Sequence, residues 1–341
     1  MMANDVGASN APHKQVPFKM ARWGLVGGLV ALALLLAYRQ GRTVALAPDS
    51  EPAGAEAVVQ VDCNAGGTVA AALANLPASK TGGTIVVSGH CTESVVIQRD
   101  GVTLRGKDDA AEIDGDIAVL VTNGASGVRL ESLRLKGRFA GLTCSYGSSV
   151  DARDLTIYGG ARGLSAFYGG ICALENSVIS RNIQGVTVGD SGSVRMSGSV
   201  VEHSVIGINI FTNGTLTLDK SGDYSRSIVR KNQTGIEVST SGSLRPVAAT
   251  IEDNRGGGLV IHAGGAVYAD EDYLVELKGN QGGGIRVRAG GILQLARGFS
   301  YEDNGGQGLE CAPGALIETK PQGVAAAGET TTGAKGWCAG G

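Results

Sequence analysis

The chain has 341 residues, of which 55 are glycine, 8 are proline and only 4 % are aromatic. It has no strict Gly-X-Y period, which excludes collagen, and so few aromatic residues require an aliphatic core. The net charge of −3 is divided between residues 1–44, which carry +4 (five Lys and Arg against Asp5), and the remainder, which carries −7. Because a body of this charge is a poor polyanion binder, we expect no nucleic-acid partner.

Residues 1–22 predict a basic cytoplasmic N-terminus, and residues 23–38, WGLVGGLVALALLLAY, form an uncharged apolar run. The run is short for a membrane span and long for the core of a signal peptide. Arg39 and Arg42 follow it and disfavour cleavage at Ala45-Leu46-Ala47, a sequence that resembles a cleavage site. We therefore predict an inner-membrane anchor, with a cleaved signal as the alternative. With an anchor, the rest of the chain belongs to the cell envelope and faces the periplasm or the exterior. With a cleaved signal, the rest of the chain is secreted.

Residues 39–57 predict a linker, and residues 58–83 predict an N-terminal cap. Inside the cap, TVAAALANLP at residues 68–77 places Val69, Leu73 and Leu76 on one side of a short helix. A stack of strands leaves an open edge at its end, and such a helix would cover it.

The rest of the chain repeats a phrase of about 22 residues, a period that indicates stacked structural repeats. The copies begin at Gly141, Gly163, Gly185, Gly207, Gly235, Gly258, Gly284 and Gly308, and weaker copies precede them. Each copy holds three short runs, and apolar residues alternate with polar ones in a period typical of strands.

Alternation places apolar residues of the first and second strands of each copy in three inward columns. These are Leu142, Leu164, Val186, Ile208, Ile236, Leu259, Ile285 and Leu309; then Cys144, Ala166, Val188, Ile210, Val238, Ile261, Val287 and Cys311; and Val150, Cys172, Val194, Leu216, Leu244, Val267, Leu293 and Leu316. Asparagine recurs at the turn after the third strand, where stacked side chains can hydrogen-bond along a ladder. These positions are Asn182, Asn232, Asn254, Asn280 and Asn304, with Ser204 in the slot between the first two.

This pattern resembles the right-handed parallel β-helix (pectate-lyase-like) family of secreted bacterial proteins. The resemblance predicts an all-β fold, a single right-handed parallel β-helix solenoid of about 10 coils over residues 84–320. Residues 321–341 would then form a low-complexity C-terminal cap or tail. The resemblance also implies that ligands lie along an outward strand face or the turns beside it.

Six cysteines in an exported chain indicate disulfides. Cys63 and Cys91 flank the predicted helix, so that a bridge would pin the cap. A bridge between Cys311 and Cys338 would tie down the C-terminal end. Cys144 and Cys172 face inward on different strands of adjacent coils, where they are either two buried thiols or a third bridge.

Four charged side chains fall on neighbouring coils of the outward face of the first strand. A carboxylate, an imidazole and two guanidinium groups suit β-elimination or epimerisation of a uronate, in which arginine neutralises the carboxylate and a base removes the C5 proton. The candidate catalytic residues are therefore Glu237, His262, Arg286 and Arg288, and charges that merely solvate a sheet face are the alternative.

Two further sets of candidates complete the hypothetical site. Rings and polar groups on outward positions and long loops predict sugar contacts at Phe167, Phe211, Asn209, Tyr224 and Tyr273. For the two phenylalanines, ordinary exposed aromatic residues are the alternative. Clustered carboxylates in the long coils supply the oxygen ligands that calcium prefers, and solvated loop charges are the alternative. These carboxylates are Asp219, Asp223, Asp270, Glu271 and Asp272.

Known catalytic motifs of the β-helix enzymes are missing, including Asn-Thr-Asp, Gly-His-Gly and Asp-Pro-His-Glu. His90, in the only Gly-His pair, lies beside Cys91 and is interpreted as structural. We therefore expect a protein that binds or modifies an extracellular polysaccharide, as a uronate lyase or epimerase if it is catalytic. A non-catalytic structural or adhesive surface rod is the alternative.

Overall fold

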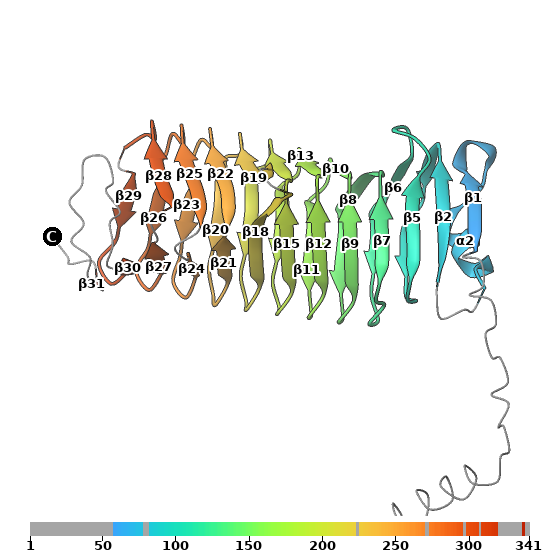
Figure 1. The fold of residues 1–341 in the computed structure, drawn as a ribbon, viewed down its shortest axis with the longest axis horizontal. Coiled ribbons are helices and arrows are strands. Elements are labelled where there is room, and N and C mark those ends of the chain that lie inside the picture. The colour runs from blue at the N-terminus through green and yellow to red at the C-terminus, as the bar shows by residue number, and fades with distance from the viewer. Residues whose placement is uncertain are drawn as a thin grey trace, which may run out of the picture. The chain divides into compact units, whose positions relative to one another are not determined.

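The computed structural model describes residues 57–77, 82–222, 225–269, 273–295, 298–306, 308–319 and 336–337. They form a parallel β-solenoid of about 11 turns, stacked along one axis from β1 to β30 (Figure 1). This confirms the predicted all-β parallel solenoid. The predicted anchor, residues 23–38, lies outside the described residues, among which no helix is both long and apolar enough to cross a bilayer.

After β1, which is followed by helices, the coils contribute strands to three parallel ladders, named A, B and C in the order in which the chain visits them. Ladder A contains β1 (Val58–Asp62), β2 (Gly83–Ser88), β5 (Val102–Gly106), β7 (Val128–Glu131), β9 (Ser149–Arg153), β12 (Ile171–Glu175), β15 (Ser193–Ser197), β18 (Thr215–Ser221), β21 (Ser243–Pro246), β24 (Ala266–Tyr268), β27 (Ile292–Leu295) and β30 (Leu316–Thr319). The short β31 (Gly336–Trp337) pairs antiparallel with β30.

Ladders B and C share two long strands, whose first halves belong to B and second halves to C. Ladder B contains β3 (His90–Thr92), β6 (Glu112–Val121), β8 (Arg134–Ser145), β10 (Thr156–Tyr158), β13 (Val178–Ser180), β16 (Val200–Glu202), β19 (Ser225–Arg230), β22 (Ala248–Glu252), β25 (Leu274–Lys278) and β28 (Phe299–Glu302). Ladder C contains β4 (Val95–Ile97), β6, β8, β11 (Arg162–Phe167), β14 (Gln184–Val188), β17 (Ile206–Ile210), β20 (Thr234–Val238), β23 (Leu259–Ile261), β26 (Ile285–Val287) and β29 (Leu309–Cys311).

The predicted inward columns form the core. In ladder C, Leu142 pairs in register with Leu164, and Leu164 with Val186. In ladder A, Val150 pairs with Cys172. Predicted inward residues from β8 to β27 are all buried, and only those of the last coil are half-exposed. Register is fixed because a slip of one residue would turn a whole column toward water.

The asparagine ladder is present and continuous. The Oδ1 atom of Asn254 accepts hydrogen bonds from the backbone N–H and the Nδ2 of Asn232, at 3.0 and 3.1 Å. Asn280 and Asn304 repeat this geometry on the next coils, while the Oγ of Ser204 accepts from the Asn182 N–H. Each amide therefore satisfies buried backbone groups of its neighbours.

A second polar ladder, at the turn between A and B, was not predicted from the sequence. Ser177 accepts from the Leu155 N–H at 2.9 Å, and Ser199 accepts from the Ser177 N–H at 3.1 Å. Both serines are buried and donate to a carbonyl two residues earlier. Single serines on separate coils carry no signal that distinguishes them from ordinary loop serines.

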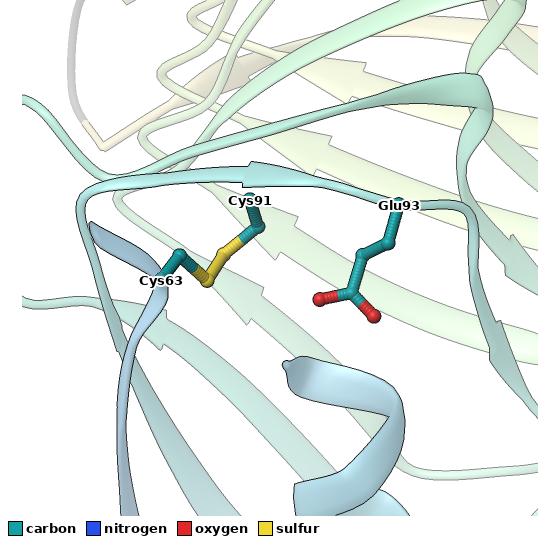
Figure 2. Close-up of side chains that lie close together, drawn as sticks. All are labelled: Cys63, Cys91 and Glu93. Atoms are coloured by element: carbon teal, nitrogen blue, oxygen red, sulfur yellow. A yellow bond between two sulfur atoms is a disulfide. The ribbon is translucent and has the colours of Figure 1, made fainter. Parts of the chain in front are cut away.

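The N-terminal cap is held by a helix, a disulfide and one carboxylate (Figure 2). Helix α2 (Val69–Asn75) has Thr68 as its N-cap and packs beside β1, which is itself the first strand of ladder A. The 3₁₀ helix η1 (Cys63–Ala65) is joined to β3 by the Cys63–Cys91 disulfide. The Glu93 carboxylate accepts hydrogen bonds from the N–H groups of Val69 and Ala70.

Two disulfides are described. Cys63–Cys91 confirms the predicted cap bridge, with 5.0 Å between the Cα atoms. Cys144–Cys172, at 6.2 Å, settles the open alternative in favour of a bridge between adjacent coils. Cys311 is also disulfide-bonded, and Cys338, its expected partner, lies outside the described residues, so this pairing stays a prediction.

Candidate carbohydrate-binding site

Two tyrosines project from consecutive coils at the turn between ladders C and A. Tyr146 and Tyr168 both have φ of 51°, in the left-handed region that bulky residues rarely adopt. Coils beside them use smaller residues, Asn123 and Asp190, at this position. The two rings stack at 4.9 Å between centroids and 17° between planes, although 59 % and 55 % of these residues are exposed. A strained backbone thus presents two stacked aromatic rings to solvent.

Two phenylalanines extend this surface from the ends of β11 and β17. The rings of Phe167 and Phe211 lie 6.2 Å apart although their coils are separated by a third. They meet over Gly189 of the intervening coil, where an added Cβ would lie 2.8 Å from Phe211 and 3.2 Å from Phe167. Arg162 lies over the Phe167 ring at 5.4 Å. We name Tyr146, Phe167, Tyr168 and Phe211 the aromatic ledge.

The other predicted sugar contacts are divided. Asn209 lies on the same face of ladder C as the ledge and is in register with Glu237. Tyr273 lies in the core instead, 7 % exposed, and its hydroxyl accepts a hydrogen bond from Arg245. Tyr224 lies outside the described residues.

The four candidate catalytic residues lie on three consecutive coils, within or just after strands of ladder C. Glu237 and Arg286 are separated by the coil of Val260, with which both are in register. Arg286 instead donates to the Glu310 carboxylate at 2.5 Å and to the Gly282 carbonyl at 3.2 Å. His262 is half-exposed and Arg288 is exposed. Neither cavity described below is lined by any of the four, and their catalytic role stays a prediction.

Of the candidate calcium ligands, the structure describes only Asp219. The Asp219 carboxylate accepts hydrogen bonds from Arg195 at 2.6 Å and from the Lys220 N–H at 2.9 Å, so cationic and amide partners already occupy it. The other four candidate ligands lie outside the described residues, and they are Asp223, Asp270, Glu271 and Asp272.

A cavity of about 460 Å³ on the outer face of ladder A was not predicted. The extra residues of the long coil 207–234 form an antiparallel hairpin between β18 and β19, and its Gly222 helps to line the cavity. Ala173 is small and leaves room between Asp151 and Arg195, its neighbours in register. Charges of both signs line the space, including Arg129, Glu131, Asp151, Arg153, Arg195 and Lys220. The cavity is therefore close to electrically balanced.

His90, interpreted from the sequence as structural, belongs to a network on the outer face of ladder B. Tyr158 donates to Glu112 at 2.5 Å, Arg134 donates to both, and His90 Nδ1 lies 3.0 Å from Glu112. Burial raises the pKa of Glu112, but hydrogen bonds from Tyr158 and Arg134, with the charges of Arg134 and His90, outweigh it and hold this pKa below its usual value. Burial and the bond to Glu112 raise the pKa of Tyr158. Glu112 and Tyr158 thus keep their ordinary charges near neutral pH, which suits a structural network better than proton transfer.

The protein is a parallel β-solenoid whose outer surface carries the aromatic ledge and a cavity of about 460 Å³. The family described as "Right handed beta helix region" matches residues 90–274, more than half of the chain. The chain therefore belongs to the right-handed β-helix family.

Among solved structures, the chain is similar to a pectate lyase at 12 % identity and a TM-score of 0.50, over 76 % of this chain and 78 % of that one. It is also similar to an alginate lyase from a Paenibacillus species (14 %, TM-score 0.38, 74 % and 99 %) and to the A-module of a mannuronan C-5 epimerase from Azotobacter vinelandii (13 %, TM-score 0.40, 74 % and 95 %). At these identities the likeness shows the fold. No curated protein sequence matches the chain.

Proposed function

We propose that this protein is an exported β-helix protein that binds a polysaccharide, with the aromatic ledge as its contact for sugar rings. The observation that carries the proposal is the stacked, exposed pair Tyr146 and Tyr168 in a strained backbone conformation. Carbohydrate C–H groups carry slight positive charge and pack against the negative face of an aromatic ring. A ledge of four rings on a rigid scaffold, two of them stacked and the phenylalanines tilted, therefore suits contacts to successive units of a glycan chain.

Export is supported by the two described disulfides, which persist in oxidising compartments. The apolar run 23–38 would anchor the protein in the inner membrane, or leave it secreted if it is cleaved. Fractionation of cells that produce the full chain tests this part: membrane association that survives high salt supports the anchor, and a product shortened beyond residue 38 contradicts it.

The binding test compares two variants on a panel of soluble neutral and acidic polysaccharides in affinity electrophoresis. The variant Tyr146→Ala with Tyr168→Ala removes the stacked pair, and Tyr268→Ala removes an exposed tyrosine from ladder A. Each ring contributes on the order of 1 kcal/mol, so the double variant should lose roughly tenfold or more in affinity. The control should bind like the wild type. The ledge is not a sugar site if no polysaccharide retards the wild type, or if the double variant binds as tightly as the Tyr268→Ala control.

The finer hypothesis is lyase or epimerase chemistry on a uronate at Glu237, His262, Arg286 and Arg288. In its favour, Arg286 already holds a carboxylate, that of Glu310. Incubation with alginate and polygalacturonate should yield the ultraviolet absorbance of an unsaturated product, or an epimer visible by NMR, and both should vanish in Arg286→Ala. Binding without either product would leave a non-catalytic surface rod, which the paired charges on its outer faces also favour.

A further inference from the structure

The outer faces of the β-helix follow a rule of alternating charge. Strands of adjacent coils lie about 4.8 Å apart, so equal charges in one column would repel and opposite charges attract. The ion pairs between coils obey this rule on ladders A, B and C, as in Arg153–Glu131, Arg195–Asp219, Lys136–Asp114, Arg230–Glu202, Lys278–Glu252 and Arg286–Glu310.

The turn between ladders B and C breaks the rule. Arg181, His203 and Lys231 occupy the same turn position on three consecutive coils, with φ of 57°, 56° and 55°. Arg138 and Arg255 lie at the same turn of other coils, outside this column, and all five side chains are exposed. We name these five residues the basic edge.

These basic side chains lack the counter-charges found elsewhere on the surface. Among the described residues, Arg181, His203, Lys231 and Arg255 have no ion pair, and Arg138 reaches Asp116 only at 4.0 Å, with both side chains well exposed. The row ends at Asp253, which follows Lys231 in the same turn column. Arg181, Lys231 and Arg255 are thus cations without ion-pair partners in the described part of the chain, and a ligand of opposite charge would gain free energy by pairing with them.

The basic edge also borders a hollow. A cavity of about 1140 Å³ is lined by its five side chains together with glycines, Asn182, Ser204 and Gln233, and no carboxylate is among the described residues that line it. Between the cations, Ile183 and Val205 are 59 % and 46 % exposed, although they are apolar. The hollow thus offers positive charge spaced along the coil axis and apolar contacts between the charges.

We propose that the basic edge binds a linear acidic polysaccharide whose carboxylates lie along the coil axis, the cations taking the carboxylates and Ile183 and Val205 the sugar faces. This surface is separate from the aromatic ledge and rests on the proposed function only for the ligand being a glycan. A nucleic acid is a poorer fit, because no Phe, Tyr or Trp is among the described lining residues and disulfides point to an oxidising compartment.

The test measures the affinity of the full chain for polygalacturonate at several salt concentrations. The variant Arg181→Glu with Lys231→Glu should lose at least tenfold in affinity and most of the salt dependence, because exposed charges are screened by salt. The matched control, Lys107→Glu with Arg129→Glu, changes the net charge equally on other faces and should keep wild-type affinity.

Three results would overturn the proposal: wild-type affinity in the edge variant, an equal loss in the control, or tighter binding of a single-stranded nucleic acid of equal charge. The proposals for the basic edge and for the aromatic ledge can be contradicted independently of each other. Loss of binding to neutral glycans in Tyr146→Ala with Tyr168→Ala reports on the ledge alone. Loss of polygalacturonate binding only in the reversal variant reports on the edge.

Discussion

Asn254 shows how one side chain can hold two coils together. Its Nδ2 donates to the Val229 carbonyl at 3.1 Å and to Asn280 Oδ1 at 2.9 Å, while its own Oδ1 accepts two hydrogen bonds from Asn232. The residue is completely buried, so no water can replace these partners. A removed amide therefore leaves several buried donors and acceptors unsatisfied.

We predict that Asn254→Ala lowers the free energy of unfolding by about 2–4 kcal/mol, because each unsatisfied buried group costs on the order of 1–3 kcal/mol. Urea unfolding followed by circular dichroism measures the loss. The exposed Gln233→Ala should change the free energy by less than about 0.5 kcal/mol. Equal midpoints for the two variants would show that the ladder does not stabilise the stack.

Glu112 links stability to pH. Its pKa is lower in the folded protein than in the unfolded chain, where it is 4.5. The carboxylate therefore stabilises the fold above pH 4.5, and this contribution disappears as pH falls through the lower, folded pKa. We predict that Glu112→Gln is less stable than the wild type at pH 7 and that the difference shrinks toward zero in acid.

Urea midpoints at pH 7, 5, 4 and 3 test the Glu112 prediction. As control, Glu310→Gln removes an exposed carboxylate that pairs with Arg286, and exposed pairs contribute only about 0–1 kcal/mol. A difference between Glu112→Gln and the wild type that stays constant with pH would contradict the argument.

At the scale of elements, the N-terminal cap is held in three independent ways: the packing of α2, the Glu93 carboxylate at its first turn, and the Cys63–Cys91 disulfide. The disulfide spans 28 residues. In the chain-entropy description, a loop of that length stabilises the fold by about 3.5 kcal/mol. We predict that Cys63→Ala with Cys91→Ala loses about this much in urea unfolding, with the native circular dichroism spectrum retained. An unchanged midpoint would mean that α2 and Glu93 suffice.

Elements and core were predictable, because few folds besides a stack of coils repeat the same strand alternation eight times at spacings of 22 to 28 residues. Leu164 and Val188 are fixed by the whole column, and Asn232 by its regular place before glycine. The sites were harder. Tyr146 and Tyr168 occupy turn positions where a bulky residue is unexpected, so no turn rule indicates them.

The basic edge was missed for a different reason. Arg181, His203 and Lys231 are 22 and 28 residues apart, and the unequal coil lengths hide their alignment until the register is known. Glu237 and Arg286 lie in the predicted column with Val260 on the coil between them, and their joint catalytic role stays a prediction. The periodicity of the sequence shows which residues share a column. Contacts between columns depend on side-chain directions, which the periodicity does not give.

At the scale of the whole β-helix, net charge and local charge lead to different conclusions. Residues after 44 carry −7, which argues against polyanions on average. However, alternating pairs neutralise most of the outer faces at short range, and they leave the basic edge as a local positive field. A polyanion close to the surface responds to that field, because charges beyond about 10 Å are largely screened in 0.1 M salt.

The two ends of the stack differ in burial, which predicts where unfolding begins. Each coil contacts mainly its neighbours, so terminal coils open first unless they are covered. At the N-terminal end Ile85 and Val87 are fully buried beneath the cap. In the last coil Leu309, Leu316 and Ile317 are only half-buried, whereas Ile285 and Leu293 one coil earlier are completely buried.

We therefore predict that native-state hydrogen exchange is fastest in β29 and β30, intermediate in β1, and slowest in β14 and β17, in the middle of the stack. Mass spectrometry of peptic fragments measures the order. Cys63→Ala with Cys91→Ala should speed exchange in β1 and leave β30 unchanged, because the loosened element lies at the opposite end. Equal protection at both ends, or faster exchange in the central coils, would contradict unfolding from the C-terminal end.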